Sequence, residues 1–209
     1  AIVRKDDQPV DPADLARMSS AIAHRGPDGA AYAILEQGRV GLGHVRLSIV
    51  DLAGGEQPLY NEDHTISVVC NGELYDYREL RRELIARGHR FRTTSDSELV
   101  IHLYEQYGTR LFDHLRGEYA FVLHDGRSKR VLAGRDHCGI KPLFYVDTSA
   151  ETLLCSEVKG IYALDRVERG LSSRYMAGPA LGIYREELSP FAHVHPVRPG
   201  HYLLIGGDG

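Results

Sequence analysis

The stretch VVCNGELYDYREL, residues 68–80, begins with apolar residues typical of a buried strand and ends with the spacing of an amphipathic helix. Asn71-Gly72 stands where the two patterns meet. An Asn-Gly pair between apolar runs usually forms a two-residue hairpin turn, but no returning strand follows here. We therefore expect a turn at Asn71-Gly72 that leads from the strand into the helix, with the acid Glu73 exposed beside it.

Three segments have the features of capped helices. In the helix that follows the opening stretch, Asp76 and Glu79 are an N-cap and third-position pair. The segment TTSDSELVIHLYEQYG repeats this arrangement with Ser95 and Glu98 as a capping box, which places Asp96 in the first helical turn. The segment DPADLARMSSAIAHRGPDG has an Asp N-cap and Pro at the first helical position, and its helix is expected to stop at the Gly-Pro pair.

The segments predicted to be strands occur in runs. AAYAILE, VGLGHVRLSIVD and ISVVCN follow one another, EYAFVLHDGRSKRVLAGRD and PLFYVDTSAETLLCSE are predicted hairpins, and HYLLI is a last strand. Residues 161–197 are expected to be irregular. Because strands and helices do not alternate strictly, antiparallel sheets with segregated helices, an α+β fold, are favoured over a doubly wound sheet.

Composition excludes several classes of function. The 209 residues carry a formal net charge of -4, which provides no basic field for nucleic acid or an anionic membrane. No apolar run approaches the ~20 residues of a membrane span, and three cysteines without a CxxC pair indicate reduced thiols, so a soluble cytoplasmic protein is expected. Of the 11 histidines only His193 and His195 form a close pair, and without HExxH or a carboxylate cluster no metal site is expected. Phosphate-loop, dinucleotide and GxSxG motifs are missing as well.

Five short motifs remain, and each has an ordinary structural explanation when it is taken alone. RGPD could end a helix, Arg46 could be a solvated charge on a strand, and Asp96 could interact with its own helix dipole. In order, the motifs are RGPDG (25–29), GHVRLSIVD (43–51), CNGE (70–73), SDSE (95–98) and RDHCGIKPLFY (135–145). Together they resemble the glutaminase domain of class II glutamine amidotransferases, most closely the asparagine synthetase branch of the N-terminal-nucleophile hydrolases. The resemblance covers Ala1 to about Gly160 and returns at VRPGHYLLIGGDG.

The resemblance implies a fold, a substrate and a set of binding residues. The fold would be a four-layer αββα sandwich, with residues 1–209 forming one glutaminase domain and 161–197 a weakly matching segment near the junction with a synthetase domain. The substrate would be L-glutamine, with its α-carboxylate on Arg46 and its α-amino group on Asp96, and with Glu73 as a further acceptor. The backbone near Ile49 and Val50 would line the pocket. Asn71 and Gly72 would form the oxyanion hole, while RGPD and RDHCGIKP would have structural roles.

The expected nucleophile of this family is an N-terminal cysteine whose own α-amino group acts as the base. This chain starts Ala-Ile-Val, and matching it to the first family strand places that cysteine a few residues before Ala1. Cys70 should face away from Asn71 by strand alternation, and neither Cys138 nor Cys155 carries an α-amino base. We therefore expect the chain as it stands to be inactive. Three alternatives are open at this point: a working enzyme that lacks its first residues, a scaffold that has lost catalysis, or a glutamine-sensing module.

The resemblance also implies a partner that consumes ammonia. Family members continue into an ATP-dependent synthetase domain with an SGGxDS loop, and no such loop occurs in these residues. Transfer of ammonia to a synthetase domain or subunit is expected, as in asparagine biosynthesis, although the acceptor is not defined by the sequence. Neither a cofactor nor a metal is expected in this domain; ATP and magnesium would serve only the synthetase. A homodimer is possible.

Overall fold

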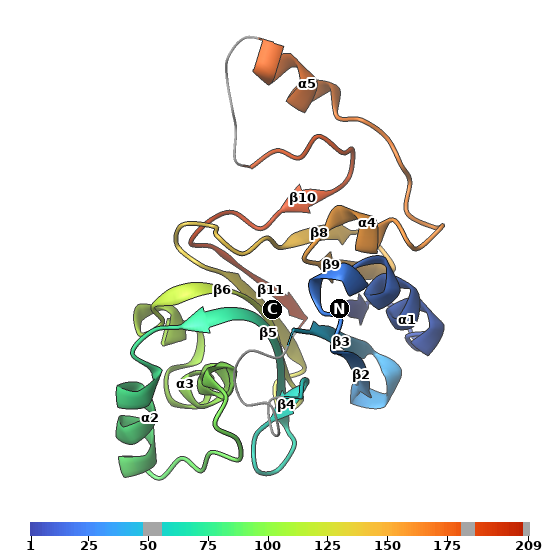
Figure 1. The fold of residues 1–209 in the computed structure, drawn as a ribbon. Helices are drawn as coiled ribbons and strands as arrows, with labels where there is room; N and C mark the ends of the chain where they lie inside the picture. The colour runs from blue at the N-terminus through green and yellow to red at the C-terminus, as the bar shows by residue number, and fades with distance from the viewer. Residues whose placement is uncertain (48–55, 181–186, 207–209) are drawn as a thin grey trace.

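Two antiparallel sheets pack face to face between layers of helices in the computed structural model of the chain, which describes residues 1–47, 56–180 and 187–206 (Figure 1). This arrangement confirms the predicted α+β class and the four-layer αββα sandwich. In one sheet the described strands lie in the spatial order β10 (His195–Pro196), β8 (Phe144–Asp147), β9 (Glu151–Cys155), β1 (Ile2–Arg4), β3 (Val40–Arg46) and β2 (Gly29–Leu35). In the other the order is β11 (Tyr202–Gly206), β7 (Arg130–Arg135), β6 (Gly117–Asp125), β5 (Ile66–Leu74) and β4 (Leu59–Tyr60).

The helices cover the outer face of each sheet. Helices α1 (Pro12–Ala21) and α4 (Val158–Ile161) lie on the sheet that contains β1, and α2 (Tyr77–Ala86) and α3 (Leu99–Tyr107) lie on the sheet that contains β5 (Figure 1). Short 3-10 turns are η1 (Ala23–Arg25), η2 (Glu36–Gly38), η3 (Asp96–Glu98) and η4 (Gly108–Asp113). Three buried apolar clusters result, one under each helical layer and one between the sheets.

Strand alternation determines which cluster each residue of β5 enters. Val68 and Cys70 belong to the cluster under α2 and α3, whereas Val69 belongs to the cluster between the sheets. The expectation that Cys70 and Asn71 face opposite sides of the sheet agrees with this division. Side chains on one face of β5 therefore pack against the helices, and those on the other face point into the space between the sheets.

The expected turn at Asn71-Gly72 is wrong, because β5 continues through both residues to Leu74. Asn71 is opposite Ala120 and Gly72 is opposite Tyr119 in the ladder with β6. Gly72 has φ +148°, and a Cβ built on it would lie 1.9 Å from the carbonyl oxygen of Glu118. Pairing with β6 over the whole of β5 prevails over the local turn preference, and glycine is required by the close approach of the two backbones. The chain turns at Tyr75 and Asp76 instead.

Both predicted capping boxes differ from the structure. Asp76 precedes α2 in a left-handed conformation and makes no side-chain cap hydrogen bond. Ser95 does cap, accepting from the Ser97 amide at 3.3 Å, but Glu98 instead accepts from the amides of Arg92 and Thr93 at 2.6 and 2.7 Å. The turn from Asp96 to Glu98 is therefore a 3-10 turn ahead of α3. The Asp11 cap on α1 is confirmed, although α1 ends at Ala21 rather than at Gly26.

Residues 161–197 contain more regular structure than expected. They include α5 (Ser173–Ala180) and the short strand β10, and Leu171 forms an isolated bridge with Phe191. Helix α5 lies well away from the two sheets at one end of the molecule (Figure 1). Leu171 and Met176 are exposed by 69% and 53%, so this segment leaves large apolar side chains uncovered.

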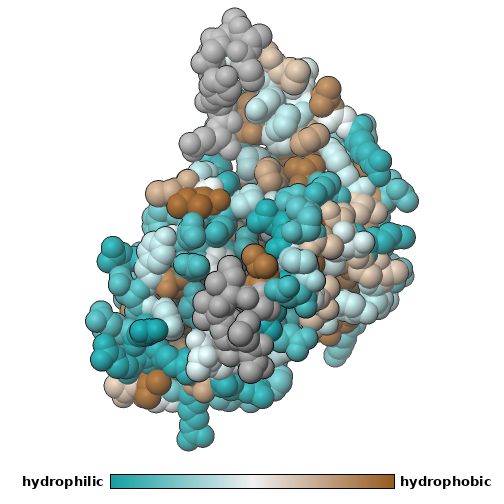
Figure 2. Space-filling view, viewed as in Figure 1, coloured by the Kyte–Doolittle hydropathy of each residue, from teal (hydrophilic) through white to brown (hydrophobic). Residues whose placement is uncertain are grey.

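Hydrophobic side chains are sparse on one face of the molecule. The face in Figure 2 is mainly hydrophilic, with hydrophobic side chains scattered singly or in small groups. None of the helices in the described ranges has the length and apolar content that a membrane crossing requires.

A charged network joins α1 to β9 and should contribute strongly to stability. Arg166 donates from Nε and Nη2 to Glu151 at 2.5 and 3.0 Å and from Nη1 to Asp14 at 2.5 Å. The two acids are only 4% and 6% exposed. Their hydrogen bonds, Glu151 first, raise the pKa of Arg166, although burial opposes this.

We expect Arg166→Met to lower the free energy of unfolding by about 2 kcal/mol, because two buried carboxylates each lose a charged hydrogen-bond partner. The loss is smaller than for an unpaired buried charge, since Arg4 still pairs with Glu151 and Arg17 with Asp14. Urea unfolding measures the change. Arg169→Met, which removes an exposed pair with Asp165, is the control and should cost no more than about 0.5 kcal/mol. Equal losses in the two variants would contradict the role assigned to the network.

Candidate active site

A pocket of about 370 Å³ opens beside the ends of β3 and β5, where all the predicted site residues within the described ranges meet. Arg46, Asn71, Gly72, Glu73 and Asp96 line it together. The two other predicted positions, Ile49 and Val50, lie outside the described residues. Residues from separate segments thus converge on one cavity.

The RGPD motif fixes the backbone at Arg46, the last residue of β3. The Asp28 amide donates to the Arg46 carbonyl at 3.0 Å, and Pro27 forms a bridge with Arg46. A Cβ on Gly26 would lie 2.3 Å from the carbonyl carbon of Val45, so only glycine permits this contact. The structural role expected for RGPD agrees with this geometry.

Asp96 is joined directly to the end of β5. Its Oδ2 accepts from the Leu74 amide at 2.7 Å, and the Ser95 cap on η3 holds the turn in which it lies. One carboxylate oxygen therefore connects the turn to the strand. This connection fixes the acid relative to Asn71, which lies three residues before Leu74 on the same strand.

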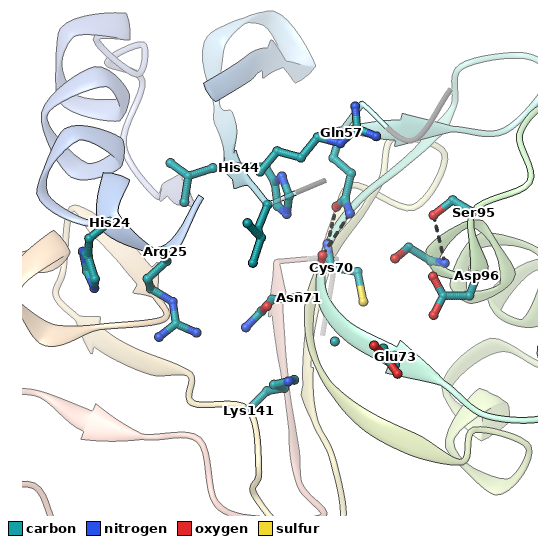
Figure 3. A pocket seen from close by; sticks show the side chains of 15 residues that line it. His24, Arg25, His44, Gln57, Cys70, Asn71, Glu73, Ser95, Asp96 and Lys141 are labelled. Carbon is teal, nitrogen blue, oxygen red and sulfur yellow. Dashed lines mark hydrogen bonds between the residues drawn. The ribbon is translucent and has the colours of Figure 1, made fainter. Parts of the chain in front are cut away.

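The Asn71 side chain points away from the Cys70 thiol and toward the side of the pocket that carries Arg25 and Lys141 (Figure 3). Its Nδ2 atom is buried and has no hydrogen-bond partner among the described residues. A buried amide donor without a partner is costly, typically about 1–3 kcal/mol. A donor whose acceptor is a ligand is expected to have no partner within the protein, as Asn71 Nδ2 has none among the described residues.

Gln57 and His44 complete the wall near Asn71, and neither was predicted from the sequence. Gln57 donates from Nε2 to the Cys70 carbonyl at 2.9 Å and accepts from the Cys70 amide at 2.6 Å, which mimics a neighbouring strand (Figure 3). Burial lowers the pKa of His44 to about 4, with a smaller lowering by Arg46, while a hydrogen bond to the Cys70 backbone opposes both. His44 is therefore neutral near pH 7.

The RDHCGIKP loop places Lys141 in the wall of the pocket. Buried Asp136 accepts from the amides of Cys138, Ile140 and Lys141, each at 3.0 Å, so one side chain shapes the whole loop. Lys141 pairs with Glu118 at 3.3 Å, next to Glu73 on the neighbouring strand. This agrees with a structural role for the motif, but the presence of Lys141 in the pocket was missed.

The charges in the pocket have an uneven distribution. His24 and Arg25 lie near one end, where both contact Glu157 Oε1, at 3.1 and 3.0 Å. Glu73 and Asp96 lie at the other end, beside β5 (Figure 3). A ligand with one anionic and one cationic group fits such a distribution better than an apolar ligand does.

The three cysteines do not provide an activated thiol in the pocket. Burial, with the Asp96 charge as a second cause, raises the pKa of Cys70 to about 12. Cys155 is buried under α4, and Cys138 is exposed in the RDHCGIKP loop. The thiolate is the nucleophilic form, so a thiol with the pKa of Cys70 is unreactive near neutral pH.

Ala1 lies close to the same site. Its nitrogen donates to the Leu154 carbonyl at 2.6 Å, which continues the ladder between β1 and β9. Ala1 also lines a second, smaller cavity of about 70 Å³, whose wall includes His44 and Asn71. Ala1 and Asn71 therefore border a common space.

Comparison with known proteins assigns the family. The family model described as a glutamine amidotransferase domain matches residues 1–209. The chain belongs to this family. It is 39% identical over 194 residues to asparagine synthetase [glutamine-hydrolyzing] 2 of Bacillus subtilis, covering 90% of this chain and 25% of that protein. It is 42% identical over 184 residues to the amidase chry2 of Gibberella zeae, covering 88% and 27%. The chain thus spans about a quarter of these relatives.

Solved structures support the fold of this glutamine amidotransferase domain. An allosteric regulatory enzyme of purine biosynthesis matches with a TM-score of 0.70 at 20% identity, covering 99% of this chain and 46% of that one. The glutamine phosphoribosylpyrophosphate amidotransferase of B. subtilis matches with a TM-score of 0.65 at 20% identity, covering 78% and 42%. At this level of identity the two likenesses show the fold alone.

Proposed function

We propose that this domain hydrolyses L-glutamine to glutamate and ammonia, and that the ammonia serves an ATP-dependent amidation of the asparagine synthetase type. Support comes from the family and from relatives named as glutamine-hydrolysing asparagine synthetases. The unpartnered, buried Nδ2 of Asn71 carries the proposal, because hydrolysis of an amide creates an oxyanion that needs such a donor.

Gly72 would supply the second donor of the oxyanion hole. The amides of Cys70 and Leu74, two residues to either side, donate to Gln57 and Asp96 at the open edge of β5. Strand alternation places the Gly72 N–H on the same edge, between these two contacts. An amide side chain and a backbone N–H would then point at one oxygen.

Arg46 and Asp96 would hold the two charged ends of glutamine. A guanidinium can donate two parallel hydrogen bonds to the α-carboxylate, and a carboxylate accepts from the α-ammonium. Asp96 Oδ2 is engaged by Leu74, so Oδ1 is the oxygen that we assign to the ammonium. Glu73 would add a second acceptor, and Ile49 and Val50 would add backbone contacts.

The nucleophile would come from a cysteine ahead of Ala1. Residues that extend β1 in that direction would enter the space bordered by Ala1, His44 and Asn71. An extended chain advances about 3.3–3.6 Å per residue, so a few residues are enough to reach the oxyanion donors. Residues 1–209 without that cysteine are predicted to be inactive.

Ammonia would pass to a synthetase domain or subunit that uses ATP and magnesium; we propose no cofactor for the glutaminase reaction itself. Residues 1–209 would form one glutaminase domain, and the uncovered apolar side chains of 161–197, such as Leu171 and Met176, suit a junction with the synthetase. We place the protein in the cytoplasm, where ATP and glutamine are available, and a homodimer is compatible with this function.

Glutamine binding should depend on both charged residues. We expect Arg46→Ala and Asp96→Asn each to weaken binding of L-glutamine by at least about 2 kcal/mol, because each leaves a charged end of the ligand unpaired. Calorimetry on residues 1–209 measures the affinity without turnover. Arg39→Ala is the control and should bind glutamine as the wild type does. Arg39 lies at the turn between β2 and β3, at the opposite end of β3 from Arg46, and pairs with exposed Asp7. Equal affinities in all four proteins would refute this assignment.

Hydrolysis is tested by following glutamate and ammonia release from protein that begins with the added cysteine. Release above a blank without enzyme supports the proposal. Binding of glutamine without release would favour the second candidate function, a glutamine-binding module or scaffold, which the intact Arg46 and Asp96 pair would permit. Absence of both binding and release would overturn the glutamine assignment.

A further inference from the structure

Two histidines and one glutamate converge outside the pocket, in the layer formed by α2 and α3. His89 follows α2, and His102 and Glu105 lie one turn apart on α3. Glu105 Oε2 lies 3.1 Å from His102 Nδ1 and 3.3 Å from His89 Nδ1. One potential ligand atom from each of the three side chains lies within 4.8 Å of the others. We propose that His89, His102 and Glu105 form a binding site for a divalent transition-metal ion of the zinc class.

Two of the three separations suit a single ion, namely those from Glu105 to each histidine. Zinc binds nitrogen and oxygen ligands at about 2.0–2.2 Å, so two ligands at a tetrahedral angle lie roughly 3.3 Å apart. The two contacts to Glu105 already have this spacing, at 3.1 and 3.3 Å. His89 is only partly buried, with 13% of its side chain exposed, and can rotate to complete the set. Two imidazoles with one carboxylate favour zinc, cobalt or nickel over magnesium or calcium.

The outer nitrogens of both imidazoles face acceptors, as they do in metal sites. His89 Nε2 lies 3.1 Å from Gln106 Oε1, and His102 Nε2 lies 3.5 Å from Glu98 Oε1. With Nε2–H donated outward, each neutral ring presents an Nδ1 lone pair toward the Glu105 carboxylate, which is the arrangement of ligand atoms around a metal ion. In the other tautomer each Nδ1–H donates to Glu105, and these protons must leave before a metal ion binds.

The surroundings hold the ligands in place. Asn61 donates to the other Glu105 oxygen at 2.9 Å, and Phe91 packs on the His102 ring with centroids 4.1 Å apart. His102 is completely buried, so its ring has little freedom to move. Supporting contacts of this kind are expected around metal ligands and fix their orientation before the ion arrives.

Protons are the competing occupant. A coordinating imidazole nitrogen must be unprotonated, so a metal ion has to displace any proton that occupies it. The ion would connect the segment after α2 to α3.

The test is titration of chelator-treated protein with zinc chloride at about pH 8. We expect about one equivalent to bind and the thermal midpoint to rise, with no response to magnesium chloride. Cobalt(II) should show the intense visible bands of a tetrahedral site. His89→Gln and Glu105→Gln should each weaken zinc binding at least tenfold and remove the cobalt bands. Both residues are partly exposed, so the variants are expected to fold, which circular dichroism checks.

His201→Gln is the matched control. His201 is exposed, and within the described part of the chain its ring lies 2.8 Å from the Pro199 carbonyl, far along the sequence from the proposed ligands, so its loss should leave zinc binding unchanged. No zinc binding by the wild type would overturn the proposal. Equal binding by His89→Gln, Glu105→Gln and the wild type would also overturn it, because the zinc would then be held by other surface groups.

Discussion

Residues 1–209 preceded by Cys-Gly-Ile are expected to release glutamate and ammonia from L-glutamine, whereas residues 1–209 alone should hydrolyse it at a negligible rate. Removal of a catalytic nucleophile typically costs on the order of 10⁶ in rate. An N-terminal cysteine combines a thiol of ordinary pKa about 8.5 with an α-amino group of about 7.7–8.0. The amine can take the thiol proton near neutral pH, and no other side chain is needed.

The measurement is turnover of L-glutamine after removal of the initiator methionine, with the mass of the N-terminus verified. A residue retained before the cysteine should suppress turnover, because it converts the amine into a peptide nitrogen. Replacement of Cys70, Cys138 and Cys155 by alanine in the extended chain should leave activity in place. If residues 1–209 alone turned over glutamine as fast as the extended chain, the proposed chemistry would be wrong.

Asn71→Ala in the extended chain is expected to reduce turnover by about 10²- to 10³-fold, equivalent to roughly 3–4 kcal/mol. The alanine removes the donor at Nδ2, which is buried and unpartnered among the described residues, so the ground state loses no hydrogen bond. The loss should therefore appear in kcat with little change in KM.

Ser67→Ala is the matched control for Asn71→Ala. Ser67 lies on the same strand and also has a buried, unpartnered polar atom, but it does not line the pocket. Its removal should leave kcat within about twofold, since a surplus hydroxyl has no part in charge stabilisation. If both variants lost activity equally, the effect of Asn71→Ala would reflect general damage to β5 rather than loss of an oxyanion donor.

Local sequence signals predicted those elements that depend on local chemistry. The Asp11 cap of α1, the two hairpins and the last strand follow from cap residues, turn residues and alternation, and the structure contains all of them. The turn at Asn71-Gly72 failed because its outcome depends on β6, almost 50 residues away, whose Glu118 carbonyl fits only against glycine. Turn propensity carries no information about such a partner.

The candidate site was predictable where the order and combination of short motifs resemble those of a known family. Arg46, Asn71, Gly72, Glu73 and Asp96 do share one pocket, although their roles stay predictions. Gln57, His44 and Lys141 were missed because each is placed by long-range contacts: Gln57 by the Cys70 backbone, and Lys141 by the loop around Asp136. The proposed metal site was not predicted from the sequence for the same reason. His89 follows α2, whereas His102 and Glu105 lie on α3, so only the packing of these segments brings the three together.

The strict alternation along β5 limits how this protein can change in evolution. Adding or deleting one residue ahead of Asn71 would exchange the two faces of the strand, so that the polar Asn71 amide would face the apolar core under α2 and α3. A point substitution on β5 changes one face of the strand, and selection can act on it separately. The insertion or deletion of one residue in β5 would disturb both the packing under α2 and α3 and the pocket at the same time. Length variation should therefore concentrate in connections such as residues 126–129 and 148–150, which lie outside the strands.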